Sequence, residues 1–150
     1  MKWLTTFFGS SIGKKLLMSL TGLFLILFLL IHLMGNLQLL KNDGGMSFNI
    51  YAKLMTTNPL IKFISYGNYF FILLHAFIGI SLALYNRTAK GQKYAVSSNN
   101  KTSWASKNMA LLGTLILAFI FIHMGDFWLK MKLDQLPMVT YPGIEGEIKD

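Results

Sequence analysis

Three long stretches of the chain are almost free of charged side chains. They cover residues 16–34, 63–85 and 109–128, and their first charged residue is Asp126, near the end of the third. A helix needs about 20 predominantly apolar residues to cross the hydrocarbon core of a bilayer. We therefore expect an all-α membrane protein, a transmembrane helical bundle with three spanning helices in a single domain over residues 1–150.

The composition of the whole chain agrees with a membrane location. Of 150 residues, 53% are hydrophobic and only 13% are charged, against roughly 25% charged residues in an ordinary soluble domain. Cysteine is absent, which excludes disulfides, zinc fingers, iron–sulfur ligation and covalently attached c-type haem. The formal charge of +8 comes from short clusters beside the apolar stretches, so we expect no nucleic-acid partner.

Basic residues beside the apolar stretches predict the orientation of the helices. Two flanks contain basic residues and no acid: Lys2, Lys14 and Lys15 before the first stretch, and Arg87, Lys90, Lys93, Lys101 and Lys107 between the second and third. The other two flanks mix lysines with acids. By the positive-inside rule, the N-terminus and the second loop face the cytoplasm, so the first and third helices run outward.

Shorter signals mark the connections. We expect a surface helix within residues 47–59, with Ser47 as a candidate cap and Asn58 and Pro59 as its end. Ser103 or Ser106 is a candidate cap for the third span.

Each predicted span contains one of the three histidines, His32, His75 and His123. Ionisable side chains inside a membrane are rare and costly, and they mark functional sites by default. An interhelical hydrogen bond, worth about 0.6–2 kcal/mol, is the alternative role for any one of them. Because one histidine occurs in each of three spans, we interpret them as metal ligands.

Two of these histidines are expected at one depth. His32 comes 16 residues after the start of the first stretch, and His123 comes 14 residues after the start of the third. These spacings correspond to about 24 Å and 21 Å of helical rise. His75 lies ten residues before the end of the second stretch, only about 15 Å from the same membrane edge. His32 and His123 can therefore pair, whereas His75 has no partner at its own depth.

A pair of imidazoles at one depth is the ligand set of a bis-histidine haem, whose iron binds one nitrogen on each face of the porphyrin. Without cysteine, that haem would be non-covalent and b-type. Gly22 and Gly113 each lie ten residues before a histidine of the pair and would leave room for the macrocycle, although close helix packing is an equal alternative. His75 is either a hydrogen-bonding histidine or a ligand whose partner lies on another helix.

Three segments together resemble the cytochrome b membrane-anchor subunit of bacterial succinate dehydrogenase/fumarate reductase, in its single-chain di-haem form. They are SSIGKKLLMSLTGLFLILFLLIHLMGNLQLL, FNIYAKLMTTNPL and SWASKNMALLGTLILAFIFIHMGDFW. The specific elements are S-S-I-G-x-K, T-G-x9-H-x2-G-N and H-x-x-D-F-W. The resemblance extends over about residues 9–135.

The resemblance implies five helices that hold two b haems, with iron bound by histidines. His32 and His123 would ligate the haem distal to the catalytic subunits. His75 would ligate the other haem, opposite a histidine on a later helix. The chain carries three of the five helices, so we expect it to lack the last two and the fourth histidine. Ser19, Lys15 and Trp104 are candidates to hydrogen-bond haem propionates.

The family also implies a place in respiratory electron transport and the tricarboxylic acid cycle, in the bacterial cytoplasmic (inner) membrane. A flavoprotein subunit with FAD handles succinate or fumarate, an iron–sulfur subunit carries electrons, and the anchor exchanges them with a quinone, expected to be menaquinone. The anchor itself would contain no catalytic residue for succinate. Some relatives release quinol protons through an acid, for which Asp43 and Asp126 are candidates. A turn role for Asp43, and a capping or hydrogen-bonding role for Asp126, are the alternatives.

Two other classes remain open at this point. One is the haem b subunit of another membrane oxidoreductase, of the formate dehydrogenase or hydrogenase type. The other is a non-haem proton or metal carrier, which would need a ladder of polar residues between its histidines; the three stretches lack one.

Overall fold

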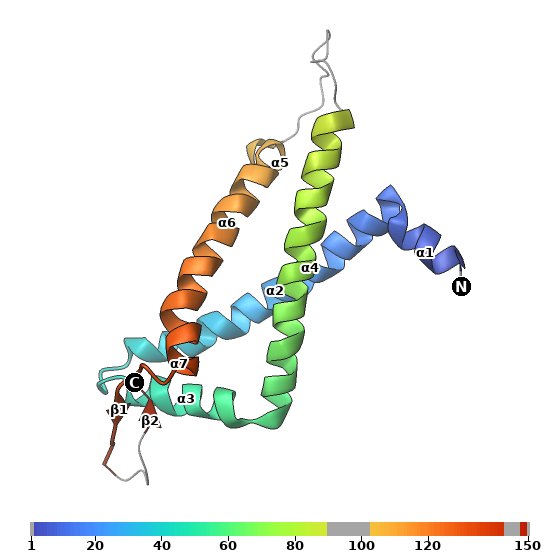
Figure 1. Ribbon diagram of the computed structural model, residues 1–150. Coiled ribbons are helices and arrows are strands. Elements are labelled where there is room, and N and C mark those ends of the chain that lie inside the picture. The colour runs from blue at the N-terminus through green and yellow to red at the C-terminus, as the bar shows by residue number, and fades with distance from the viewer. Residues whose placement is uncertain (1, 90–102, 143–147, 150) are drawn as a thin grey trace.

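The computed structural model describes residues 2–89, 103–142 and 148–149, and most of them are helical (Figure 1). Three helices are long and apolar enough to cross a membrane, which confirms the predicted all-α, multi-pass architecture. The described β structure is one short antiparallel pair, β1 (Met138–Val139) with β2 (Ile148–Lys149).

The spanning helices extend beyond the apolar stretches that predicted them. They are α2 (Ser11–Asn36), α4 (Pro59–Ala89) and a composite third span of α6 (Met109–His123), the π-helical segment η2 (Met124–Leu129) and α7 (Lys130–Lys132). All three are longer than predicted because polar residues at their ends continue the helix. An apolar stretch reports the thickness of the hydrocarbon core and not the full length of the helix.

The three spans alternate in direction, as predicted. α2 and α6 both run toward the end of the bundle where the short helix α3 (Met46–Thr57) lies, and α4 runs away from it (Figure 1). We call this region the α3 end. α4 packs against both α2 and α6, so it is the central element of the described bundle.

Local hydrogen bonds fix the connections at the α3 end. After the 3-10 turn η1 (Leu37–Leu40), Gly44 and Gly45 adopt φ values of +61° and +83°, which glycine tolerates without strain. Gly45 is the N-cap of α3, and Ser47 donates its backbone N–H and its hydroxyl to the Asp43 carboxylate. The prediction of Ser47 as the cap is therefore wrong, because Asp43 supplies the accepting oxygen.

The predicted end of α3 is confirmed. Asn58 ends α3, and its side-chain oxygen accepts the backbone N–H groups of Leu60 and Ile61 at the start of α4. The predicted cap of the third span is wrong: Ser103 caps the separate short helix α5 (Trp104–Lys107), accepting the N–H of Ser106, and the N-cap of α6 is Asn108, which makes no side-chain capping bond. At the other terminus, Ser10 separates α1 (Lys2–Gly9) from α2 and caps α2 through the N–H of Gly13.

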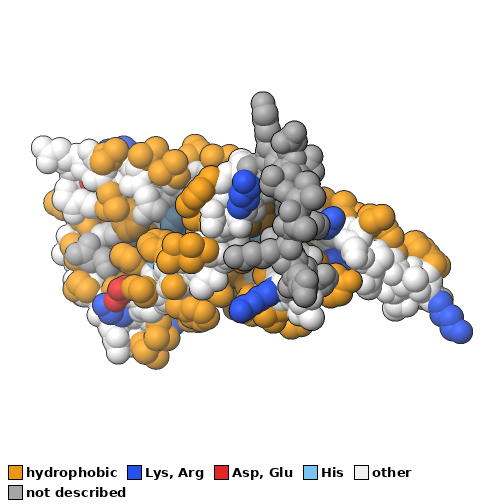
Figure 2. Space-filling view, turned by 90° about the horizontal axis from the view of Figure 1, so that it is seen from above, with side chains coloured by type: hydrophobic (Ala, Val, Ile, Leu, Met, Phe, Trp, Pro, Cys, Tyr) orange, Lys and Arg blue, Asp and Glu red, His pale blue; other side chains and the backbone are white. Residues whose placement is uncertain are grey.

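Apolar side chains cover much of the visible surface (Figure 2). Among the described residues, Ile78 is the one hydrophobic side chain that is buried, whereas Thr21, Asn49 and Asn68 are buried polar residues. This inverted pattern suits helices whose outer faces contact lipid, where the bundle interior holds the polar groups. The contact of α2 with α4 includes Phe24 and Phe71, whose ring centroids are 4.6 Å apart.

Candidate functional site

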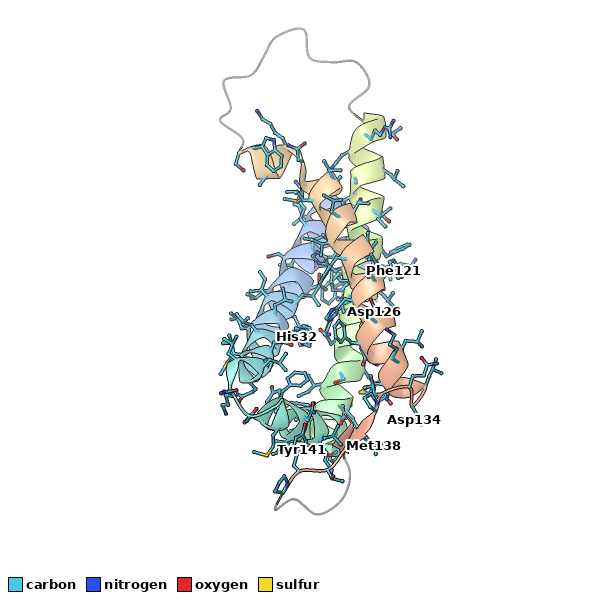
Figure 3. All side chains as sticks on the ribbon, turned by 90° about the vertical axis from the view of Figure 1, so that its left-hand side faces the viewer. His32, Phe121, Asp126, Asp134, Met138 and Tyr141 are labelled. Atoms are coloured by element: carbon cyan, nitrogen blue, oxygen red, sulfur yellow. The ribbon has the colours of Figure 1, made fainter. Side chains whose placement is uncertain are left out.

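His32 and His123 lie next to each other near the α3 end. His32 points from α2 toward the third span, and His123 is the last residue of α6 (Figure 3). Their ring centroids are 5.7 Å apart, with ring planes at 86°. The two residues are 91 positions apart in the sequence, so the proximity predicted from their depths is confirmed.

This separation is compatible with binding of one metal ion between the rings. Metal–nitrogen bonds are about 2 Å long, so two coaxial imidazole ligands have ring centres roughly 6 Å apart. The observed 5.7 Å is close to that value. It is also an ordinary distance for two rings in edge-to-face contact. Paired histidine nitrogens are a ligand set that haem iron accepts, so the residue types present fit that group.

Each imidazole of the pair stacks on a phenylalanine of its own helix. Phe28 lies four residues before His32, and Phe119 lies four residues before His123. Both pairs have centroid distances of 5.4 Å, and their planes are within 24°. These phenylalanines were not among the predicted site residues, although residues at i and i+4 share a helical face and the F-x-x-x-H spacing occurs twice. The stacking restricts how each ring can rotate.

A change in helical form follows His123 directly. The N–H of Met124 bonds to the carbonyls of both Ile120 and Phe121, and the π-helical segment η2 begins there. Such single π segments inside α-helices often occur at functional sites. Within η2, Phe127 also contacts His123, at a centroid distance of 5.0 Å. The His123 imidazole therefore contacts the phenylalanines four residues before it and four residues after it.

The two acids considered for proton release have local partners. Asp126 in η2 forms an exposed ion pair with Lys130, with an N–O distance of 3.1 Å. Asp43 accepts the two hydrogen bonds from Ser47, and these hold the pKa of its carboxyl below the ordinary value. The Asp43 contacts agree with its turn role, whereas the ion pair with Lys130 was not among the roles predicted for Asp126.

His75 lies apart from the pair, between α4 and the middle of α2. Its Nδ1 is 2.9 Å from the hydroxyl oxygen of Thr21. Thr21 precedes His32 by 11 residues, which is about 16 Å of helical rise. The three histidines therefore occupy two separate levels of the bundle.

The small residues near the histidines have different surroundings. A Cβ on Gly22 would lie 3.3 Å from His75 Cε1, so Gly22 faces His75. A Cβ on Gly113 would meet no heavy atom of the described residues within 4 Å. Ser19 is exposed on α2. Lys15 and Trp104, the other propionate candidates, are also exposed.

A cavity of about 330 Å³ opens at the α3 end, between α3, α4 and the end of the third span. It is lined by Met55, Thr56, Lys62, Ser65, Tyr66, Tyr69, Trp128, Met131 and Lys132. The lining offers ammonium and phenol donors and no carboxylate, so it can receive a ligand with oxygen acceptors. This cavity was not predicted from the sequence; aromatic residues clustered at the ends of two spans were the available signal.

No protein-family model, curated protein or solved structure matches the chain.

Proposed function

We propose that this chain is the haem b-containing membrane anchor of a succinate:quinone oxidoreductase, passing electrons between an iron–sulfur subunit and a membrane quinone. The observation that carries the proposal is the His32–His123 pair, whose ring centres are 5.7 Å apart. The resemblance of the sequence around both histidines supplies the type of complex. A pair of histidines alone would fit any b-type membrane cytochrome.

In this role, His32 and His123 would hold the haem through its iron. Phe28 and Phe119 would hold the two rings against rotation, and the apolar spans would keep water away. When bound, the haem supplies one-electron transfer, at a potential that depends on its ligands and its burial.

The distribution of basic residues supports an orientation for the complex. Lys14 and Lys15 lie near the start of α2, Arg87 in the last turn of α4 and Lys107 in the last turn of α5, all away from the α3 end. By the positive-inside rule, this side would face the cytoplasm of a bacterium. The FAD-containing flavoprotein and the iron–sulfur subunit would bind there.

The cavity at the α3 end is where a quinone headgroup would fit. Lys62, Tyr66 and Tyr69 line it and can donate hydrogen bonds to the two carbonyl oxygens of a quinone. Trp128 in the same lining follows His123 by five residues. A quinone, with menaquinone as the expected type, would therefore lie on the same side of the bundle as the histidine pair.

A reduced-minus-oxidised optical spectrum tests the proposal. The full chain, purified in detergent and supplied with haem, should show a b-type α-band that His32→Ala and His123→Ala remove. Thr114→Ala is a matched control, because this exposed residue of α6 contacts neither histidine. A helical wild-type protein, verified by circular dichroism, that shows no b-type band would overturn the proposal.

A further inference from the structure

The distances around the Thr21 hydroxyl indicate which ring nitrogen of His75 carries the proton. Thr21 is only 3% exposed. Its hydroxyl oxygen is 2.7 Å from the Leu17 carbonyl, 3.3 Å from the Met18 carbonyl and 2.9 Å from His75 Nδ1. Three polar atoms therefore compete for one hydroxyl group.

The hydroxyl has one proton to donate and two lone pairs to accept with. A carbonyl oxygen can only accept. Because the Leu17 carbonyl is the nearest of the three atoms, the threonine proton points at it, as is usual for threonine in a helix. The hydroxyl can then only accept from His75, so the proton of that contact is on Nδ1. The reverse arrangement would place lone pairs of the hydroxyl and the Leu17 carbonyl against each other at 2.7 Å.

We propose that Thr21 is a positioning residue that holds His75 as the Nδ1–H tautomer, leaving Nε2 unprotonated and able to bind a metal. Metal-binding histidines characteristically donate their other ring N–H to a fixed acceptor, which sets both tautomer and ring orientation. As a statement about haem, this rests on the proposed function, since Nε2 would be the nitrogen offered to the iron. The tautomer itself does not require that function.

The neighbour of Thr21 supports the same role. A Cβ at Gly22 would lie 3.3 Å from His75 Cε1, the ring carbon between the two nitrogens, and 3.9 Å from Nδ1. Glycine at this position lets the imidazole approach α2 closely enough to reach the hydroxyl. The Thr-Gly dipeptide therefore acts as one unit, in which Thr21 accepts the ring proton and Gly22 makes room for the ring.

Nitrogen NMR of the haem-free chain tests this assignment. The full chain, labelled with ¹⁵N-histidine in detergent micelles, is measured at a pH at which the imidazoles are neutral. Correlations from ring nitrogens to ring C–H protons distinguish the two tautomers, and His75→Gln identifies the His75 signals by their loss. We expect the Nδ1–H pattern in the wild type and in Thr21→Ser, which keeps the hydroxyl. Thr21→Val, which keeps the volume, should shift His75 to the Nε2–H form that imidazoles favour in water.

An Nε2–H pattern for His75 in the wild type, or no change of pattern in Thr21→Val, would overturn the inference. Circular dichroism verifies that each variant is helical. The two proposals fail separately. A haem-binding chain with Nε2–H His75 would refute the role of Thr21 and keep the proposed function. A chain that binds no haem but shows Nδ1–H His75 would refute the function and keep the tautomer.

Discussion

The two histidine levels of the bundle have different chemistry. At the α3 end, two imidazoles from different helices lie next to each other, and each contacts a phenylalanine ring of its own helix. Among the described residues, no hydrogen bond reaches either ring of this pair. In the middle of the bundle, a single imidazole is bound to a buried hydroxyl and rests against a glycine. The pair at the α3 end offers two imidazole ligands for a metal, but no hydrogen bond from the described residues fixes their tautomers. The middle level has one imidazole whose tautomer is fixed and no second imidazole beside it.

The histidines at the two levels are positioned by different helix contacts. The pair depends on three helices bringing two side chains to one depth, whereas His75 depends on the packing of two helices, α2 and α4. Substitutions at one level should therefore leave the other largely unchanged.

The largest expected effect is the loss of one haem site. His32→Ala and His123→Ala should each abolish the same b-type absorption, and the double variant should lose no more than either single variant. His75→Ala should spare that signal, because it lies at another level. Difference spectra of the purified variants, at equal protein concentration, measure this. Loss of the pair's haem in His75→Ala would show that the two levels are one site.

Alanine substitutions at three glycines should destabilise the fold in the order of how closely other side chains approach each glycine. A Cβ on Gly35 would lie 2.5 Å from the Tyr51 ring, one on Gly22 3.3 Å from His75, and one on Gly113 would meet nothing described. We expect Gly35→Ala to cost about 1–3 kcal/mol of unfolding free energy and Gly22→Ala to cost less. Gly113→Ala should be neutral or stabilising by up to about 1 kcal/mol, since alanine favours helix.

Unfolding in mixed micelles measures this order. Gly35 supports the α3 end and Gly22 supports the middle level, so only Gly22→Ala should also change the His75 ring signals. If Gly113→Ala were the most destabilising of the three, it would contradict the open space that the structure shows around Gly113.

A smaller effect is expected from the stacked phenylalanines. Aromatic pairs contribute about 0.5–1.5 kcal/mol beyond their burial, so Phe28→Leu and Phe119→Leu should each weaken haem binding by a few-fold to about tenfold. Phe24→Leu is the control, because Phe24 contacts Phe71 between α2 and α4 and belongs to the other level. Haem titration followed by absorbance gives the affinities. Equal losses in all three variants would contradict a specific role of the stacked rings.

The smallest expected effect concerns the turn before α3. Hydrogen bonds from Ser47 lower the pKa of the Asp43 carboxyl. The carboxylate therefore stabilises the folded turn above the carboxyl's ordinary pKa, and this contribution is lost as the pH falls through the lowered value. Asp43→Asn should remove that pH dependence. Amide hydrogen exchange at the start of α3 measures it, and His75 should not respond.

Part of this arrangement could be predicted from the sequence. Uncharged stretches gave the three spans, and counting residues along them gave the proximity of His32 and His123, because helical rise is regular. The Thr21–His75 contact could not be predicted, since it depends on how α2 and α4 are rotated about their axes. For the same reason, Gly22 and Gly113 look equivalent in the sequence and differ in the structure.

The π-helical segment after His123 contains one residue more than an α-helix would need to cover the same rotation. A π-helical residue turns through roughly 80° and an α-helical residue through about 100°. The six residues of η2 therefore turn about as far as five α-helical residues would. A single-residue insertion in this span can thus be absorbed within η2, with His123 still next to His32 and with Met131 and Lys132 still in the wall of the cavity.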